Sequence, residues 1–278
     1  MKSLTVLLFI GALFFFGNAT AQEKFQLEYK YRQDQTYRYQ EESKYESTQE
    51  INGQEFKATG STFSLMNMTI KNVSENGDLT FLGFLEDYKV VAKSAYMDTT
   101  MVMKDILNRN IQTIISKKGR MIEKQLLDTT NIGTDFFGKG DGLLSVYKEF
   151  AIFPDQEVKF GDTWNDERTD TAKGTQMVTL TKGVYTLLAV EEKNNRTCLK
   201  ISFTGKTEIS GKMTQMGMEF FMEGSGESTG TLWFDQKAGI LIAKESTIDQ
   251  DMTMALTGQM QMTIPITSST NTTYNLIE

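Results

Sequence analysis

Methionine is the residue type whose number and spacing in this sequence could support a specific chemistry. The chain of 278 residues holds 16 methionines, and several occur as Met-x-Met pairs, such as Met252 with Met254. Successive side chains of a β-strand point to opposite faces, so such a pair would place both thioethers on one face. Thioethers are flexible and polarizable. They can therefore fill an irregular core, line a site for an apolar ligand or bind a soft metal such as Cu(I).

The two longest methionine-rich stretches lie in the C-terminal half of the chain. We predict that their residues of one parity form a continuous wall that binds an apolar ligand: Met216, Met218, Phe220, Met222, Met252, Met254, Met260 and Met262. Burial of these side chains in a filled core is the main alternative, and copper binding is a further one. We expect no cofactor.

The sequence offers little for acid–base or nucleophilic catalysis. It contains no histidine, which excludes a Ser-His-Asp triad, a Cys-His pair and the common zinc sites. The adjacent acids Glu191 and Glu192 would point to opposite faces of a strand, while Asp249 and Asp251 would share the polar face. We therefore expect no catalytic residues and no enzymatic activity.

The charge and the cysteine content of the chain limit its possible functions further. The formal net charge is −7, from 29 basic and 36 acidic residues. Nucleic acids and anionic membranes attract clusters of basic residues, and no such cluster is present in this sequence. The single cysteine, Cys198, stands in an apolar strand pattern, so we expect a buried thiol and not a reactive one.

The N-terminus has the pattern of a secretory signal peptide. Lys2 precedes an apolar run from Leu4 to Phe16, and Ala19-Thr20-Ala21 supplies a small-x-small cleavage site. We predict cleavage after Ala21 and export to the periplasm or the extracellular space. No later segment reaches the ~20 apolar residues that a membrane-spanning helix needs.

Apolar and polar residues alternate along most of the remaining chain, which predicts half-buried β-strands. Turn signals separate them at Asn52-Gly53, Asn76-Gly77, Lys118-Gly119 and Ala238-Gly239. Residues 248–266 alternate without a change of phase, so we predict one long strand with a bend at Gly258 and no hairpin there. Short helices are expected at 103–110 and 142–150.

Two pairs of segments indicate an internal repeat. Val73–Leu82 resembles Val190–Leu199, and Ile114–Ile122 resembles Trp233–Ile242. We predict a mainly β fold of long, curved antiparallel sheets, shaped as a half-barrel or barrel and built from a duplicated unit, with one or two short helices. The expected organisation is a signal peptide at 1–21, a first β unit at 22–127, a connecting segment with a short helix at 128–152, and a second β unit at 153–278.

One motif carries a family resemblance. The stretch from Phe153-Pro154 through Val158 and Phe160 to Gly161-Asp162-Thr163-Trp164 resembles a motif of an uncharacterised family of exported Gram-negative bacterial proteins, known as a domain of unknown function. The resemblance implies fold and compartment and no catalytic residues. More loosely, the long curved sheets are similar to the half-barrels of periplasmic lipoprotein carriers, which hold acyl chains against an apolar concave face.

These observations favour a periplasmic or secreted protein that binds a lipid or another apolar ligand on a methionine-rich concave face. A non-catalytic structural or interaction protein of the cell envelope, with a filled core and an envelope protein as its partner, is the alternative. An outer-membrane barrel is a third alternative, because the strands of such barrels also alternate between apolar and polar residues.

Overall fold

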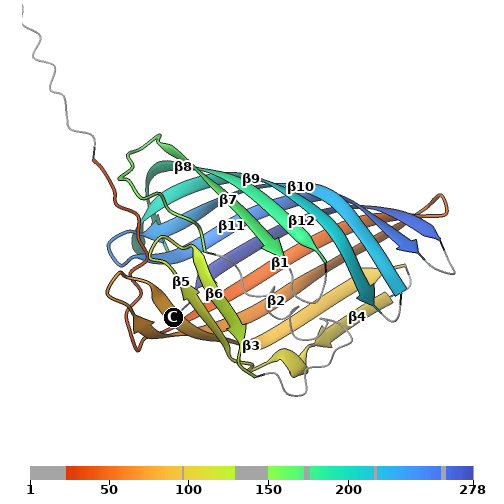
Figure 1. Ribbon diagram of the computed structural model, residues 1–278, viewed down its shortest axis with the longest axis horizontal. Coiled ribbons are helices and arrows are strands. Elements are labelled where there is room, and N and C mark those ends of the chain that lie inside the picture. Colours follow the sequence, from red (N-terminus) through yellow and green to blue (C-terminus); the bar gives the residue numbers. More distant parts are fainter. Residues whose placement is uncertain are drawn as a thin grey trace, which may run out of the picture.

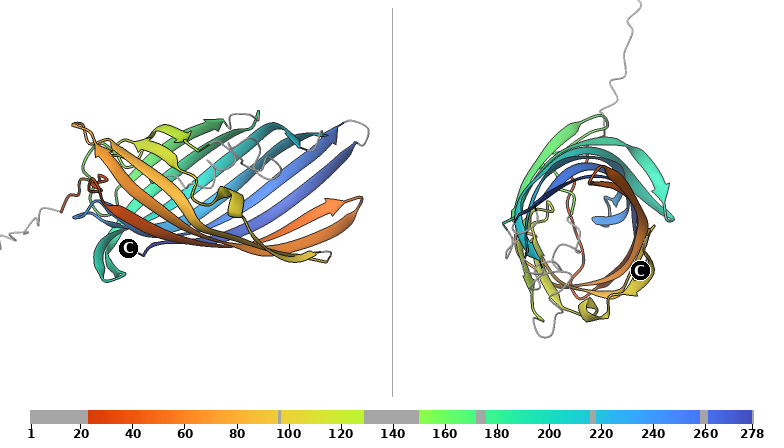
Figure 2. Two further views of the ribbon diagram at one scale, coloured as in Figure 1. Left: turned by 90° about the horizontal axis from the view of Figure 1, so that it is seen from below. Right: turned by 90° about the vertical axis from the view of Figure 1, so that its right-hand side faces the viewer.

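A computed structural model describes residues 23–95, 97–128, 150–171, 176–215, 218–257 and 261–277. These residues form a single 12-stranded antiparallel sheet that curls around its long axis (Figures 1 and 2). Side chains therefore point either into the curl or out of it. The predicted mainly β fold with a long, curved sheet is confirmed.

The strands are arranged almost in chain order. The elements are β1 (Thr36–Ile51), β2 (Gln54–Val73), β3 (Leu79–Ser94), β4 (Met97–Val102), the 3₁₀ helix η1 (Lys104–Ile106), β5 (Ile111–Ile115), β6 (Met121–Leu126), β7 (Thr163–Thr171), β8 (Val178–Lys193), β9 (Arg196–Gln215), β10 (Met218–Asp235), β11 (Ile240–Thr257) and β12 (Met262–Leu276). Their order in the sheet is β6-β5-β3-β2-β1-β12-β11-β10-β9-β8-β7, and β4 pairs with β3 beside this path.

The two predicted β units share this sheet because β1 pairs with β12. The segments compared in the repeat are hairpin turns in both halves: β2–β3 matches β8–β9, and β5–β6 matches β10–β11. A duplicated unit is therefore plausible, and the boundaries of the units remain a prediction.

The predicted turns occur where glycine or asparagine adopts positive φ. Asn52 and Gly53 have φ of 53° and 77° and join β1 to β2, and Gly77, Gly119 and Gly239 also have positive φ. Sequence reasoning missed one further hairpin. Asn194 and Asn195, with φ of 51° and 59°, join β8 to β9 in the same way.

The prediction of one continuous strand over residues 248–266 is wrong. β11 and β12 form an antiparallel hairpin in which Leu256 lies opposite Met262. In this register the two residues of each pair are either both even-numbered or both odd-numbered. Even-numbered residues therefore lie on one face of the hairpin in both strands, and odd-numbered residues lie on the other. A hairpin with this register keeps the phase of the alternation, and the alternation therefore cannot distinguish it from a continuous strand. Gly258 itself lies outside the described residues.

Of the two predicted helices, the first is shorter than expected and the second stays a prediction. Within 103–110 the structure has η1, a single turn whose last residue, Ile106, is buried. The predicted helix at 142–150 falls almost wholly outside the described residues. No helix in the described part of the chain is long and apolar enough to cross a membrane.

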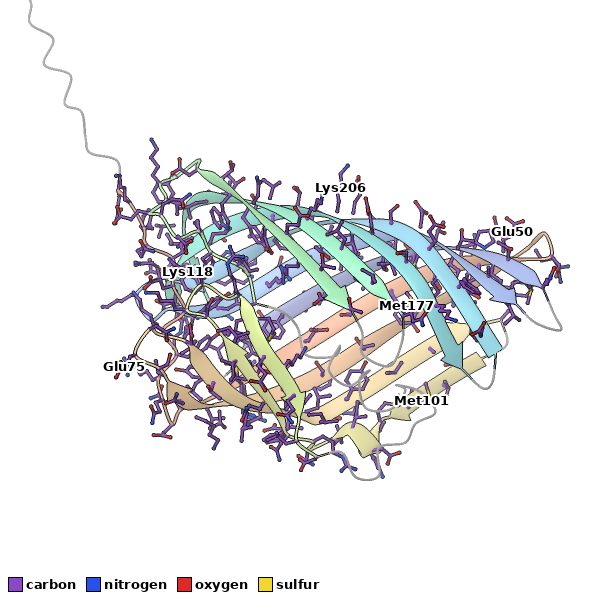
Figure 3. All side chains as sticks on the ribbon, viewed as in Figure 1. Glu50, Glu75, Met101, Lys118, Met177 and Lys206 are labelled. Carbon is purple, nitrogen blue, oxygen red and sulfur yellow. The ribbon has the colours of Figure 1, made fainter. Side chains whose placement is uncertain are left out.

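The packed core lies at one end of the curled sheet, near Lys118 and Glu75 in Figure 3, while Glu50 lies at the opposite end. We call these the core end and the far end. Residues 23–33 cross the core end, where the backbone N–H of Tyr29 donates to the Lys117 carbonyl at 2.8 Å. The Tyr29 ring stacks on Phe153 with centroids 4.9 Å apart. The apolar core thus closes this end.

Candidate ligand-binding site

The described members of the predicted methionine wall lie together on the inner face of three neighbouring strands. Met222 on β10 is directly opposite Met254 on β11, and Phe220 is opposite Leu256. Leu256 in turn lies opposite Met262 on β12. We call the surface formed by five residues on these strands the Met wall: Phe220, Met222, Met252, Met254 and Met262.

The Met wall differs from the core in its exposure to solvent. All five members are half-buried, and none of the five belongs to the packed core of the described residues. Met66 and Met68, which do belong to it, are 9% and 1% exposed. The chain therefore uses methionine in two ways, as core filling at the core end and as a partly exposed inner surface toward the far end.

Three predicted residues cannot be placed on this surface. Met216 and Met260 lie outside the described residues, and the side chain of Met218 is likewise not described. The cross-strand neighbours extend the surface instead. Ile266 lies opposite Met252, and the next two positions in the same row are Gln49 on β1 and Phe56 on β2.

A glycine on β10 leaves room for one of these methionines. Gly224 lies opposite Met252, and a Cβ atom built on Gly224 would approach Met252 Cγ to 2.6 Å. Met252 therefore leans over the glycine, where a larger residue would displace it.

A cavity of about 120 Å³ lies on the same inner face between the Met wall and the core end. Its polar lining includes Glu41 on β1, Thr113 on β5, Lys124 on β6, Lys244 on β11 and Tyr274 on β12. We call it the inner cavity. The curl of the sheet brings β6, which is an edge strand, across from β11.

Cross-strand pairing explains which side chains enter the inner cavity. Glu41 lies opposite Tyr274, which lies opposite Lys244, so the three follow one another across the inner face. On the other wall Thr113 lies between Phe81 and Lys124. Glu41 is 8% exposed and Thr113 is 2% exposed.

Burial keeps the tyrosines of the inner cavity neutral. Desolvation raises the pKa of Tyr274 and of Tyr39 well above the usual value. These hydroxyl groups therefore remain hydrogen-bond donors at neutral pH.

Sequence reasoning missed the inner cavity completely. The predicted turn at Lys118-Gly119 places Thr113 and Lys124 on one hairpin, but Lys244 lies 120 positions after Lys124 (244 minus 124), and nothing in its local pattern marks it as their neighbour. Only the order of the strands and the curl of the sheet bring Lys244 close to the other two residues.

Comparison with known families gives one match. Residues 135–241 match the model of a family described as Family of unknown function (DUF6263). The predicted resemblance to an uncharacterised family is confirmed. The DUF6263 match covers the segment that contains Phe153 to Trp164 and ends in β11. No curated protein sequence matches this chain.

Among solved structures, the chain is similar to lipovitellin, with a TM-score of 0.50 and 10% sequence identity. That structure concerns lipid–protein interactions in lipovitellin. The match covers 89% of this chain and 25% of the lipovitellin chain, so this chain spans about a quarter of that protein. This likeness concerns the fold alone.

Two bacterial structures match with lower scores. The hypothetical lipoprotein YmcC from Escherichia coli (K12) has a TM-score of 0.24 and 12% identity, over 81% of this chain and 85% of that one. Pseudomonas aeruginosa OpdQ has a TM-score of 0.29 and 8% identity, over 87% of this chain and 99% of that one.

Proposed function

We propose that this chain is an exported, non-catalytic protein of the cell envelope that binds an apolar ligand, such as the acyl chain of a lipid, on the Met wall. The observation that carries the proposal is the half-buried state of Met222, Met252 and Met254 on one inner face, apart from the packed core.

The physical reason is the free energy of the exposed apolar surface. Covering such surface contributes roughly 25 cal/mol per Å², and a ligand bound on the Met wall would supply that cover. Methionine side chains adopt many shapes at low cost. They can therefore follow alkyl chains of different length and curvature.

The fold and the N-terminal sequence support this proposal independently. A protein studied for its lipid–protein interactions, lipovitellin, shares the overall fold. The signal-peptide pattern of residues 1–21 supports export.

Native mass spectrometry of the protein purified from its export compartment tests the proposal. We expect co-purified lipid adducts, or uptake of the neutral apolar fluorophore N-phenyl-1-naphthylamine with a rise in its fluorescence. A ligand-free mass together with no uptake of the fluorophore would contradict the proposal and favour a structural protein with a filled interior.

A further inference from the structure

The inner cavity combines an apolar lining with charged groups, a combination that the Met wall lacks. Met66, Phe81 and Ile248 contribute apolar surface, while Lys124 and Lys244 contribute two positive charges. Glu41 contributes one negative charge. The net charge of these three side chains is +1, which complements a ligand group that carries a single negative charge.

Thr113 provides a second and independent indication of a ligand. It lines the inner cavity and is 2% exposed. Among the described residues, its buried Oγ1 atom has no hydrogen-bond partner. Buried hydroxyl groups nearly always have a partner, because leaving one without a hydrogen bond costs about 1–3 kcal/mol. A ligand oxygen in the inner cavity would supply that partner.

The size of the inner cavity limits what can enter it. Its volume of about 120 Å³ is well below the ~300 Å³ at which sites for whole drug-sized ligands begin. It can hold a small head group and the first carbons of a chain, and the rest of the ligand must lie elsewhere. The head group of a two-chain phospholipid, with its glycerol, is too large.

The inner face of β11 leads from the inner cavity to the Met wall. Ile248 lines the inner cavity, and Met252 and Met254 follow on the same face of β11. At ~3.3 Å per residue they lie ~13 and ~20 Å further along the strand. A single alkyl chain of ordinary length spans this path.

We propose that the inner cavity binds the carboxylate of a single-chain fatty acid, with Lys124 and Lys244 facing the carboxylate and the alkyl chain extending toward the Met wall. This inference rests on the proposed function and specifies its ligand class. The negative charge of a doubly charged phosphate would exceed the single net positive charge of Lys124, Lys244 and Glu41, whereas the charge of a carboxylate matches it.

The test compares dodecanoate with 1-dodecanol, which has the same chain and a neutral head. Both compete with N-phenyl-1-naphthylamine for the full exported protein, and the loss of fluorescence gives each affinity. We expect dodecanoate to bind roughly tenfold more tightly than dodecanol, since a charge-assisted hydrogen bond distinguishes them.

Substitutions in the inner cavity test which residues cause the preference for dodecanoate over dodecanol. Lys124→Gln and Lys244→Gln should each weaken dodecanoate binding by roughly tenfold and leave dodecanol binding unchanged. Thr113→Val, which keeps the side-chain shape, should weaken dodecanoate binding severalfold. Lys206→Gln is the matched control, because the Lys206 side chain is 79% exposed and pairs with Glu227. It should change neither affinity. Lys124 lies on an edge strand, so its variant keeps the test usable if Lys244→Gln fails to fold.

The outcomes separate this inference from the proposed function. Equal binding of dodecanoate and dodecanol, or unchanged dodecanoate binding in both lysine variants, overturns the carboxylate site and leaves apolar binding on the Met wall intact. Failure of the unmodified protein to bind the fluorophore, together with a ligand-free native mass, overturns the proposed function and the carboxylate site together.

Discussion

Met222 on β10 lies directly opposite Met254 on β11, with both side chains on the inner face of the sheet. The two residues are 32 positions apart in the chain (254 minus 222), yet the hairpin register makes them neighbours. This pairing joins two methionine-rich stretches into one surface. That surface is half-buried and lies apart from the packed core.

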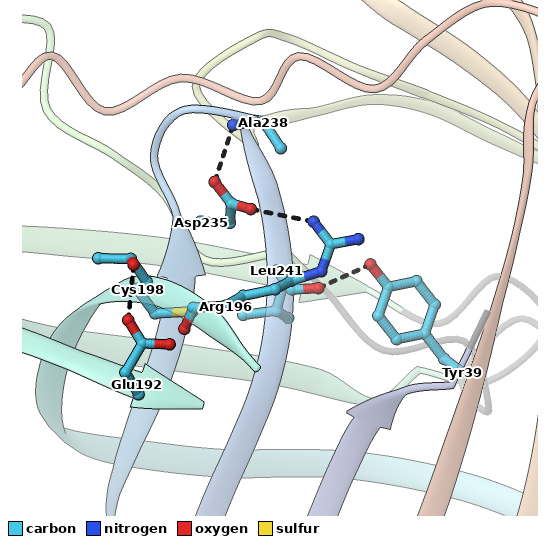
Figure 4. A network of polar contacts seen from close by, with 8 residues as sticks. Tyr39, Glu192, Arg196, Cys198, Asp235, Ala238 and Leu241 are labelled. Carbon is cyan, nitrogen blue, oxygen red and sulfur yellow. Dashed lines mark hydrogen bonds and ion pairs between the residues drawn. The ribbon is translucent and has the colours of Figure 1, made fainter. Parts of the chain in front are cut away.

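The hydroxyl group of Tyr39 connects three parts of the core end. It donates to the Leu241 carbonyl at 2.9 Å (Figure 4) and lies 2.7 Å from the Tyr31 hydroxyl. Tyr39 has one hydroxyl hydrogen, so Tyr31 donates the second bond. We expect Tyr39→Phe to lower the free energy of unfolding in urea by about 1–3 kcal/mol.

Tyr45→Phe is the control for that substitution. Tyr45 is on the same strand and face, but within the described residues its hydroxyl makes no hydrogen bond. Its removal should change the free energy of unfolding by less than about 0.5 kcal/mol. Equal losses for the two variants would contradict the role assigned to Tyr39.

Gly119 is needed both for its backbone conformation and for the space around it. Its φ is 87°, and a Cβ atom there would lie 2.2 Å from the Ala151 carbonyl oxygen. Gly53 has φ of 77° and open space around it. Alanine at either position costs about 1–2 kcal/mol for positive φ. We expect Gly119→Ala to lower the melting temperature clearly further than Gly53→Ala, and an equal effect would argue against the close approach.

Alternation in the sequence was enough to predict which side chains share a face. Met252 and Met254 lie on the inner face, and Asp251 and Thr253 on the outer one. Alternation could not show that the chain reverses between Leu256 and Met262, because the hairpin register preserves the phase. The inner cavity was beyond prediction for another reason. The proximity of Lys124 and Lys244 depends on how far the whole sheet curls, and no local pattern encodes this.

Cys198 should be unreactive in the folded protein. The side chain is 1% exposed, and desolvation, the largest cause, raises the pKa of its thiol to about 11. At pH ~8 very little thiolate is present, and the reagent cannot reach the sulfur. We expect modification by a disulfide reagent to be at least ~100-fold slower in buffer than in urea. Rapid stoichiometric labelling of the folded protein would contradict this.

Glu86 should make stability depend on pH. Arg38 Nη2 lies 2.7 Å from Glu86 Oε2, and this hydrogen bond is the main cause that lowers the pKa of Glu86. A carboxyl whose pKa is lowered on folding stabilises the protein above its unfolded pKa, and the contribution is lost as the pH falls through the folded pKa. Glu86→Gln should therefore lower the free energy of unfolding at pH ~7, with a smaller difference at pH ~3.

The control for this pH dependence is Glu55→Gln. Glu55 is 3.8 Å from Lys57, and its side chain is 67% exposed. Such exposed pairs contribute little, so the variant should match the unmodified protein at both pH values. A Glu86→Gln effect of the same size at both pH values would show that the charge of Glu86 is not its cause.

Binding of N-phenyl-1-naphthylamine to Met254→Lys and Thr253→Lys tests the Met wall most directly. The two positions are adjacent on β11, with Met254 on the inner face and Thr253 exposed on the outer face. A lysine at position 254 places a charge on the apolar surface, whereas a lysine at position 253 points into solvent. We predict that Met254→Lys weakens binding at least ~10-fold, equivalent to about 1.4 kcal/mol, and that Thr253→Lys leaves it unchanged. Equal binding by the two variants would contradict a ligand site on the Met wall.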